Sequence, residues 1–306
     1  MKRRLGKSWS RREFLGSLAA GGTAALLGLE ADSAEGFGDV ECVKTPLNEG
    51  PSQALAAGKV DFVMNDPPGH LMSIDEGGPI ALLAGSIPAA GNLFGNDSVH
   101  TLRDLKGKKV AAPQRSSRKE FVAAMVASVG LDPDKDIVWV DHEPGESMRR
   151  YAAGQIDTFM GFAPEPQELR ARGIGHVILN TLTDRPWSQY FCCLAATNRT
   201  FMSRYPVATR RALRAFVKAA EICIGDPQRA ARTMVARGVS DKYEYVLQAV
   251  REIGYRNWRL YDAEDTARFR SLRLREAGVI KISPKKVLAE ATDWHFINEL
   301  KREMKV

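Results

Sequence analysis

Several motifs of common enzyme chemistry are missing from this sequence. It contains no Gly-x4-Gly-Lys-Ser/Thr phosphate loop, no Gly-x-Ser-x-Gly nucleophile elbow and no His-Glu-x-x-His zinc signature. Histidine is scarce, and its five copies are scattered without the paired spacing of a metal site. These absences argue against hydrolase, nucleotide-dependent and zinc-dependent activities. They predict no catalytic residue, no metal and no cofactor.

Cysteine is scarce as well, with Cys42, Cys192, Cys193 and Cys223 as its four copies. An exported protein can pair such residues, but the spacing does not say which ones. Cys192 and Cys193 are neighbours on an expected strand, where successive side chains point to opposite faces, so a bond between these two is not expected. Buried free thiols are the default expectation.

A strong excess of one charge is also lacking once the N-terminus is set aside. The formal net charge is +7, but residues 1–34 hold six basic and three acidic side chains, which leaves about +4 for the rest of the chain. Basic residues further along alternate with apolar ones at helical spacing, as in Thr209 to Arg214, which is typical of a solvated helix face. The charge pattern therefore predicts no nucleic-acid partner.

The N-terminal apolar run, Phe14 to Leu29, falls short of a membrane span. A bilayer demands roughly 20 strongly apolar residues, whereas glycines interrupt this run. It follows a basic start, the pair Arg11-Arg12 and the bulky pair Phe14-Leu15, which together look like a bacterial twin-arginine export signal. The leader predicts passage through the twin-arginine translocase to the periplasm. We place the export signal at residues 1–34 and expect cleavage near residues 31–34.

From residue 39 onward, short β-like runs alternate with helical stretches, which predicts an α/β fold with mainly parallel sheets. The expected strands cover residues 39–43, 60–64, 79–84, 109–112, 136–140, 155–160 and 176–179, and the expected helices cover residues 51–57, 71–75, 117–129, 146–153 and 166–171. The stretch Leu55 to Asp61 is echoed by Tyr151 to Asp157, each time followed by a strand and a proline-bearing loop. The echo suggests two lobes that share a plan, or else two unrelated helix ends with the same stop signal.

The pattern after Pro206 is almost entirely helical. Apolar residues recur there at helical spacing, and three helix starts carry a capping side chain, at Asp226, Ser283 and Asp262. The last helix, with Phe296, Ile297 and Leu300, is expected to dock on a lobe.

Candidate ligand-binding residues stand where the predicted strands end, because open α/β sheets bind small molecules at that edge. In the first half of the chain they are Asn65, Asp66, Pro67 and Ser86; in the second they are Arg115, Ser116, Ser117, Gly161, Phe162 and Glu165. The serines precede a helix, so they either help to hold an anion or merely cap that helix. Trp187 and Tyr190, further on, either stack on a planar ligand or pack between the lobes.

Several of these segments together resemble substrate-binding proteins of ABC importers, of the nitrate/sulfonate/taurine type often labelled SsuA/THI5-like. The segments are Ala57 to Asp61, Asn65 to His70, Leu105 to Val110, Phe162 to Pro166 and Arg185 to Cys193. The resemblance implies a type II periplasmic-binding-protein fold, with lobe 1 at residues 35–102 and 200–306 and lobe 2 at 103–199. It further implies a monomeric, non-enzymatic receptor that closes on a small anionic or heteroaromatic solute and serves a membrane permease and its ATPase.

The sequence departs from the family pattern at its start. Family members place a strand, a loop and a helix before the stretch that matches Ala34 to Phe37, whereas here the leader runs directly into it. The loss of a central strand would impair binding or reshape the first lobe. Two other classes share the fold: pyrimidine-synthase enzymes of thiamine biosynthesis, whose cysteine-rich motif Cys192-Cys193 matches too briefly, and transcription-regulator effector lobes, which need a DNA-reading helix pair.

Overall fold

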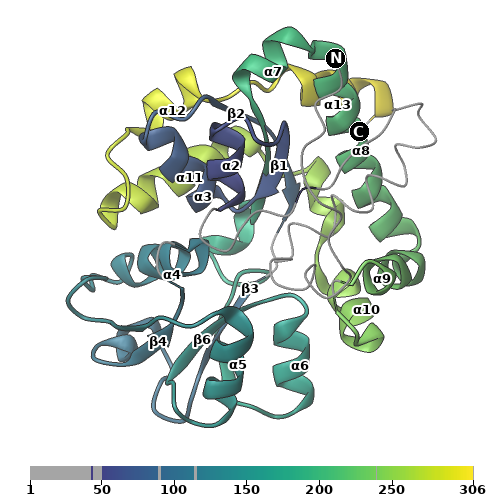
Figure 1. The fold of residues 1–306 in the computed structure, drawn as a ribbon. Helices are drawn as coiled ribbons and strands as arrows, with labels where there is room; N and C mark the ends of the chain where they lie inside the picture. The colour runs from purple at the N-terminus through teal and green to yellow at the C-terminus, as the bar shows by residue number, and fades with distance from the viewer. Residues whose placement is uncertain (1–42, 44–49, 89–90, 114–115, 239, 306) are drawn as a thin grey trace.

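The computed structural model describes residues 43, 50–88, 91–113, 116–238 and 240–305 and contains two β-sheets, one above the other in Figure 1. Three expectations lie outside these residues, apart from Val43: the strand at residues 39–43, the export leader with Arg11, Arg12, Phe14 and Leu15, and the ligand contact of Arg115. Within the described part of the chain, no helix is both long and apolar enough to span a bilayer.

Among the described residues, the lower sheet in Figure 1 has five strands in the order β5-β4-β6-β3-β7. Their bounds are β3 Gly91–Gly95, β4 Lys109–Ala111, β5 Val138–Val140, β6 Thr158–Phe162 and β7 His176–Asn180. Strand β4 pairs parallel with β5 and β6, whereas β3 runs antiparallel to β6 and β7. Helices α4 (Ser117–Ala127), α5 (Pro144–Ala152) and α6 (Glu165–Ala171) lie around it in Figure 1.

The upper sheet has three strands among the described residues, in the order β1-β8-β2. Their bounds are β1 Phe62–Asn65, β2 Ile80–Ile87 and β8 Cys193–Asn198, and β8 is antiparallel to both neighbours. Helices α2 (Pro51–Ala56) and α3 (Pro67–Asp75) belong to this half. The outer edge of β2 is covered from far along the chain, since Leu82 N–H donates to Ala291 O at 2.9 Å and Asp293 N–H to Leu82 O at 2.8 Å.

The expected α/β fold class is confirmed, but the expectation of mainly parallel sheets is wrong, because four of the six strand pairings among the described residues are antiparallel. Within each sheet all strands run in one direction except β3 in the lower sheet and β8 in the upper one. Because each reversed strand lies between two others, most pairings are antiparallel although most strands are codirectional. Strand β3 was not expected from the sequence.

The chain crosses between the sheets twice, and the two crossings lie together. It leaves the upper sheet after β2 and enters the lower one at β3, and it returns from β7 to β8. At the lower end Gly91 and Thr181 exchange hydrogen bonds of 2.8–3.1 Å, and at the upper end Cys192 N–H donates to Ile87 O at 2.8 Å. The expected lobe boundaries near residues 102 and 199 stay a prediction.

The C-terminal third is helical, as expected. Its described elements are α7 Arg199–Arg204, α8 Pro206–Gly225, α9 Pro227–Ala236, α10 Tyr243–Glu252, the 3-10 turn η4 Tyr255–Arg259, α11 Ala263–Glu276, α12 Pro284–Glu290 and α13 His295–Met304. The 3-10 turns η2 Leu102–Leu105 and η3 Trp187–Gln189 lie earlier in the chain. All three predicted caps are confirmed, because the side chains of Asp226, Asp262 and Ser283 accept backbone N–H groups of α9, α11 and α12.

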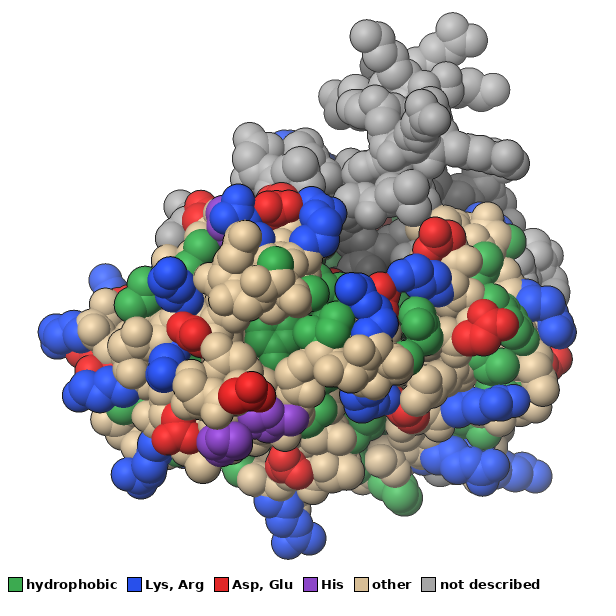
Figure 2. All heavy atoms as spheres, turned by 90° about the horizontal axis from the view of Figure 1, so that it is seen from below, with side chains coloured by type: hydrophobic (Ala, Val, Ile, Leu, Met, Phe, Trp, Pro, Cys, Tyr) green, Lys and Arg blue, Asp and Glu red, His purple; other side chains and the backbone are tan. Residues whose placement is uncertain are grey.

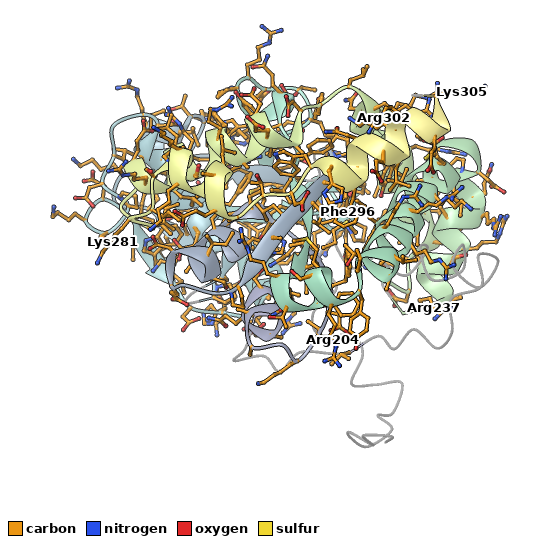
Figure 3. The ribbon with its side chains drawn as sticks, turned by 90° about the horizontal axis from the view of Figure 1, so that it is seen from above. Arg204, Arg237, Lys281, Phe296, Arg302 and Lys305 are labelled. Atoms are coloured by element: carbon orange, nitrogen blue, oxygen red, sulfur yellow. The ribbon has the colours of Figure 1, made fainter. Side chains whose placement is uncertain are left out.

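Helix α13 docks as predicted, against α8 and β2. Phe296 lies on its inner side next to the sheet, whereas Arg302 and Lys305 extend from its outer end (Figure 3). In both copies of the echoed segment, a glycine with positive φ follows the end of the helix, and a strand comes next. These glycines are Gly58 at φ 67° and Gly154 at φ 71°.

On the described part of the face in Figure 2, basic and acidic side chains are intermixed and form no continuous basic band. This distribution agrees with the low charge excess of the chain outside the leader.

Candidate functional site

The upper sheet places its predicted residues at the ends of β1 and β2. Asn65 is the last residue of β1, and Asp66 and Pro67 are the N-cap and first residue of α3, so the expected loop from Asn65 to His70 is in large part the first turn of a helix. Ser86, within β2, donates a hydrogen bond of 3.2 Å to Cys193 O of β8. The strand pairing therefore brings Ser86 and the start of β8 together.

A buried hydrogen-bond chain holds Asn65 in place. His70 is fully buried, and its Nε2 lies 3.1 Å from Leu194 O, a group that only accepts. Nε2 therefore carries the proton, and Nδ1 accepts from the Ser52 hydroxyl at 3.0 Å. Ser52 Oγ in turn accepts from Asn65 Nδ2 at 3.1 Å. Burial lowers the pKa of His70 to about 4, so the ring is neutral at pH 7.

The start of α4 shows the capping role foreseen for one of the two serines. Ser116 is the N-cap, and its Oγ accepts from Lys119 N–H at 3.3 Å. Ser117 is the first helical residue, and its side chain lies outside the described part, as does Arg115. Nothing in the described atoms therefore assigns these residues to a ligand.

Glu165 forms a bidentate ion pair with Arg118 of α4. Its Oε2 and Oε1 accept from Arg118 Nη1 at 2.9 Å and Nη2 at 3.1 Å, and Oε2 also accepts Phe162 N–H at 2.9 Å. Arg118 Nη1 donates to Met160 O at 2.6 Å as well. With side-chain exposures of 11% for Arg118 and 21% for Glu165, the pair is largely shielded. Arg118 is therefore neutralised within the protein, and Gly161 and Phe162 end the strand beside it.

Trp187 and Tyr190 lie on the second crossing, and both pack against protein rings. Trp187 is 2% exposed, with ring centroids 5.8 Å from Phe121 of α4 and 5.5 Å from Phe269 of α11. Tyr190 is half-buried and stacks on Phe269 at 3.9 Å with an 8° interplanar angle. The ring centroids of Phe121 and Phe162 are 6.2 Å apart, so a continuous series of aromatic contacts connects the lower sheet with α11.

Arg270 of α11 lies in the middle of these rings. Its guanidinium carbon is 4.6 Å from the ring centre of Phe121, 5.4 Å from that of Trp187 and 5.7 Å from that of Phe269, three rings that we call the aromatic cage. Burial lowers the pKa of Arg270 to about 10, which leaves the side chain cationic at pH 7.

The structure therefore brings part of the predicted set to one junction between the sheets. Phe162, Glu165, Trp187 and Tyr190 meet through α4 and α11, while the charge of Asp66 acts on both Arg270 and Cys193.

Sequence reasoning missed the aromatic cage residues Phe121 and Phe269 and the central Arg270. A signal for Arg270 exists, because it falls on the same helical stripe as the buried Ala267 and Leu274.

The remaining chemical groups of the described chain do not add a reactive centre. Cys192, Cys193 and Cys223 are buried free thiols, as expected, and burial raises the pKa of Cys223 to about 12. In the residues that the structure describes, no three His, Cys, Asp or Glu side chains cluster as metal ligands would. Cys42 lies outside those residues.

Comparison with solved structures finds the same fold in several binding proteins. The periplasmic nitrate-binding protein NrtA from Synechocystis PCC 6803 superimposes with a TM-score of 0.74 at 16% identity, over 94% of this chain and 87% of that chain. The alkanesulfonate-binding protein SsuA from Xanthomonas axonopodis pv. citri, bound to MOPS, gives 0.69 at 16% identity, over 89% and 94%.

The aliphatic sulphonate-binding protein SsuA from Escherichia coli gives a TM-score of 0.66 at 14% identity, over 83% of each chain. Comparison with curated protein sequences finds no match. The family model described as NMT1/THI5 like matches residues 35–230, which is more than half of the sequence. The chain therefore belongs to the NMT1/THI5-like family.

Proposed function

We propose that this protein is the solute-binding component of an ABC importer. It captures a small anionic or heteroaromatic solute without transforming it and delivers it to a membrane permease driven by an ATPase. The observation that carries the proposal is the convergence of ligand-binding candidates from both sheets and from a crossing at one junction. The binding proteins that share the fold support it.

The same proposal assigns the lobes and the compartment. We place one lobe around each sheet, with crossings between Ile87 and Gly91 and between Asn180 and Cys193. The expected boundaries at residues 102 and 199 then move to these crossings, and the lobes close on the solute by rotation about them. We further propose that the expected twin-arginine leader directs the protein to the periplasm, where it acts as a monomer.

The test is a thermal-shift panel on the exported mature protein, with nitrate, alkanesulfonates and pyrimidines as probes. At least one probe should raise the melting temperature in a concentration-dependent way, because a ligand that binds only the folded state stabilises it. Tyr190→Ala should reduce that shift. The matched variant Tyr205→Ala, whose ring is 45% exposed on α7–α8, should leave it unchanged.

A protein that responds to none of the three probe classes would contradict solute capture. Iron and pyridoxal phosphate in the purified protein would instead favour a pyrimidine-synthase enzyme. If a probe does shift the transition, the expectation that a missing first strand and helix impair binding is wrong.

A further inference from the structure

Arg270 is a buried cation whose hydrogen bonds are largely unmade. The residue is 3% exposed, and its Nη2 donates only a long bond of 3.4 Å to Phe191 O. Nε and Nη1 have no hydrogen-bond partner among the described residues. Buried guanidinium groups are normally paired, because an unpaired charge in an apolar setting is costly.

Arg118 provides an internal comparison. It is the other largely buried arginine at this junction, and each of its terminal nitrogens has a partner on Glu165 or on Met160 O. A purely structural arginine is satisfied in this way. Arg270 differs because no carboxylate accepts from its Nε and Nη1 groups in this bidentate way, although the charge of Asp66 interacts with the guanidinium electrostatically.

The surroundings of Arg270 come from three separate parts of the chain. Phe121 belongs to α4 beside the lower sheet, Trp187 to the second crossing, and Phe269 to α11 of the upper half. Cation–π contacts with these rings hold the guanidinium but satisfy none of its N–H groups. Separation of the two halves would open the cage around Arg270, because α4 and α11 pack against each other there.

We propose that Arg270 binds the anionic group of the captured solute and that the aromatic cage selects a planar organic anion, an arenesulfonate or arenecarboxylate. The inference rests on the proposed solute-binding function. Two oxygens of the anion accept from Nη2 together with Nε or Nη1, which are the donor pairs of a guanidinium edge. The solute's ring packs against Phe121, Trp187 and Phe269, a contact that nitrate or a short alkyl chain cannot replace.

Isothermal titration of the full-length protein with benzenesulfonate, ethanesulfonate and nitrate tests this assignment. Benzenesulfonate should bind most tightly. Arg270→Gln should weaken it by about 10- to 100-fold, as expected for the loss of hydrogen bonds to a charged group. The control Arg268→Gln lies on the same helix with a half-exposed side chain paired to Glu264, so it should leave the affinity unchanged.

Arg270→Met separates a binding role from a structural one. Methionine fills the aromatic cage without a buried charge, so the melting temperature of the free protein should rise by about 2–4 °C while benzenesulfonate binding is lost. Arg270→Lys keeps the charge without the planar fork and should recover only part of the affinity. A lower melting temperature for Arg270→Met with unchanged affinity would show that Arg270 is structural.

The outcomes also separate this inference from the function beneath it. If nitrate or ethanesulfonate binds equally well to wild type and to Arg270→Gln, solute capture stands and the role of Arg270 is wrong. If the wild type binds neither these anions nor pyrimidines, the proposed function fails and the inference fails with it.

Discussion

Acidification should destabilise this protein through His70. The neutral ring donates through Nε2 to Leu194 O and accepts at Nδ1 from Ser52, so a second proton on Nδ1 would face a hydroxyl that already accepts from Asn65. The pKa is about 4 in the folded protein, below the ordinary histidine value of 6.5. Between these values the unfolded chain binds more protons than the folded one, so the free energy of unfolding falls as the pH falls.

The size of the effect follows from the two pKa values. At about 1.4 kcal/mol per pKa unit, the loss is about 2 kcal/mol by pH 5 and about 3 kcal/mol near pH 4, and it levels off at pH values well below 4. Urea unfolding followed by tryptophan fluorescence at a series of pH values measures it. Carboxylates titrate near the lower end of this range too, so His70→Gln provides the comparison that isolates the imidazole.

His70→Gln should be less stable than wild type at pH 7, because it disturbs a buried hydrogen-bond chain, but its stability should fall less between pH 6.5 and 4.5. His142→Gln changes a half-exposed ring and should keep the wild-type slope. Equal slopes for wild type and His70→Gln would refute the reasoning.

Three further perturbations have defined outcomes. Gly85→Ala should lower the melting temperature markedly, because the new Cβ would lie 2.0 Å from the Phe191 ring and overpacking costs about 1–3 kcal/mol or more. Glu165→Gln should cost about 2 kcal/mol in urea unfolding, since the guanidinium of Arg118 loses its charged partner. Replacement of Arg11-Arg12 by two lysines should keep a fused reporter inside the cell, as fractionation would measure.

Controls and contradicting outcomes can be stated for these three perturbations. Gly145→Ala meets only the Arg149 side chain at 3.9 Å and should leave the melting temperature almost unchanged, so similar losses for Gly85→Ala and Gly145→Ala would contradict the packing argument. The control for Glu165→Gln is Glu264→Gln, which removes an exposed charged partner of Arg268 and should change the free energy of unfolding little. A reporter that leaves the cell regardless of the arginine pair would count against the twin-arginine route.

Much of the fold could be predicted because its signals are local. Helix caps such as Asp226 and Ser283, helix ends such as Gly58, and the alternation of β-like and helical runs each depend on a few neighbouring residues. Strand β3 was not predicted because it starts and ends with glycine, a residue that is depleted in strands. Its place is set by pairing with β6 and β7, which come far later in the chain.

The candidate site was harder to predict for the same reason. Strand ends pointed to Phe162, Glu165 and the second crossing, which the structure does bring to one junction. An arginine in a helix rich in arginines is normally solvated, and Arg270 is buried only because α4 packs against α11. The helical stripe with Ala267 and Leu274 indicates which side of the helix Arg270 lies on, but no local pattern records which distant segments cover it.

The two sheets also differ in how much of the chain must exist before each is complete. The five-stranded sheet is one continuous stretch from Gly91 to Asn180, whereas the three-stranded sheet lacks its central strand until Asn198 has been made. During synthesis, the five-stranded sheet should therefore be complete before the three-stranded one, although its first strand is made later. Until β8 is made, β1 and β2 lack the strand that pairs with both, and their unpaired backbone groups are open to pairing with other chains.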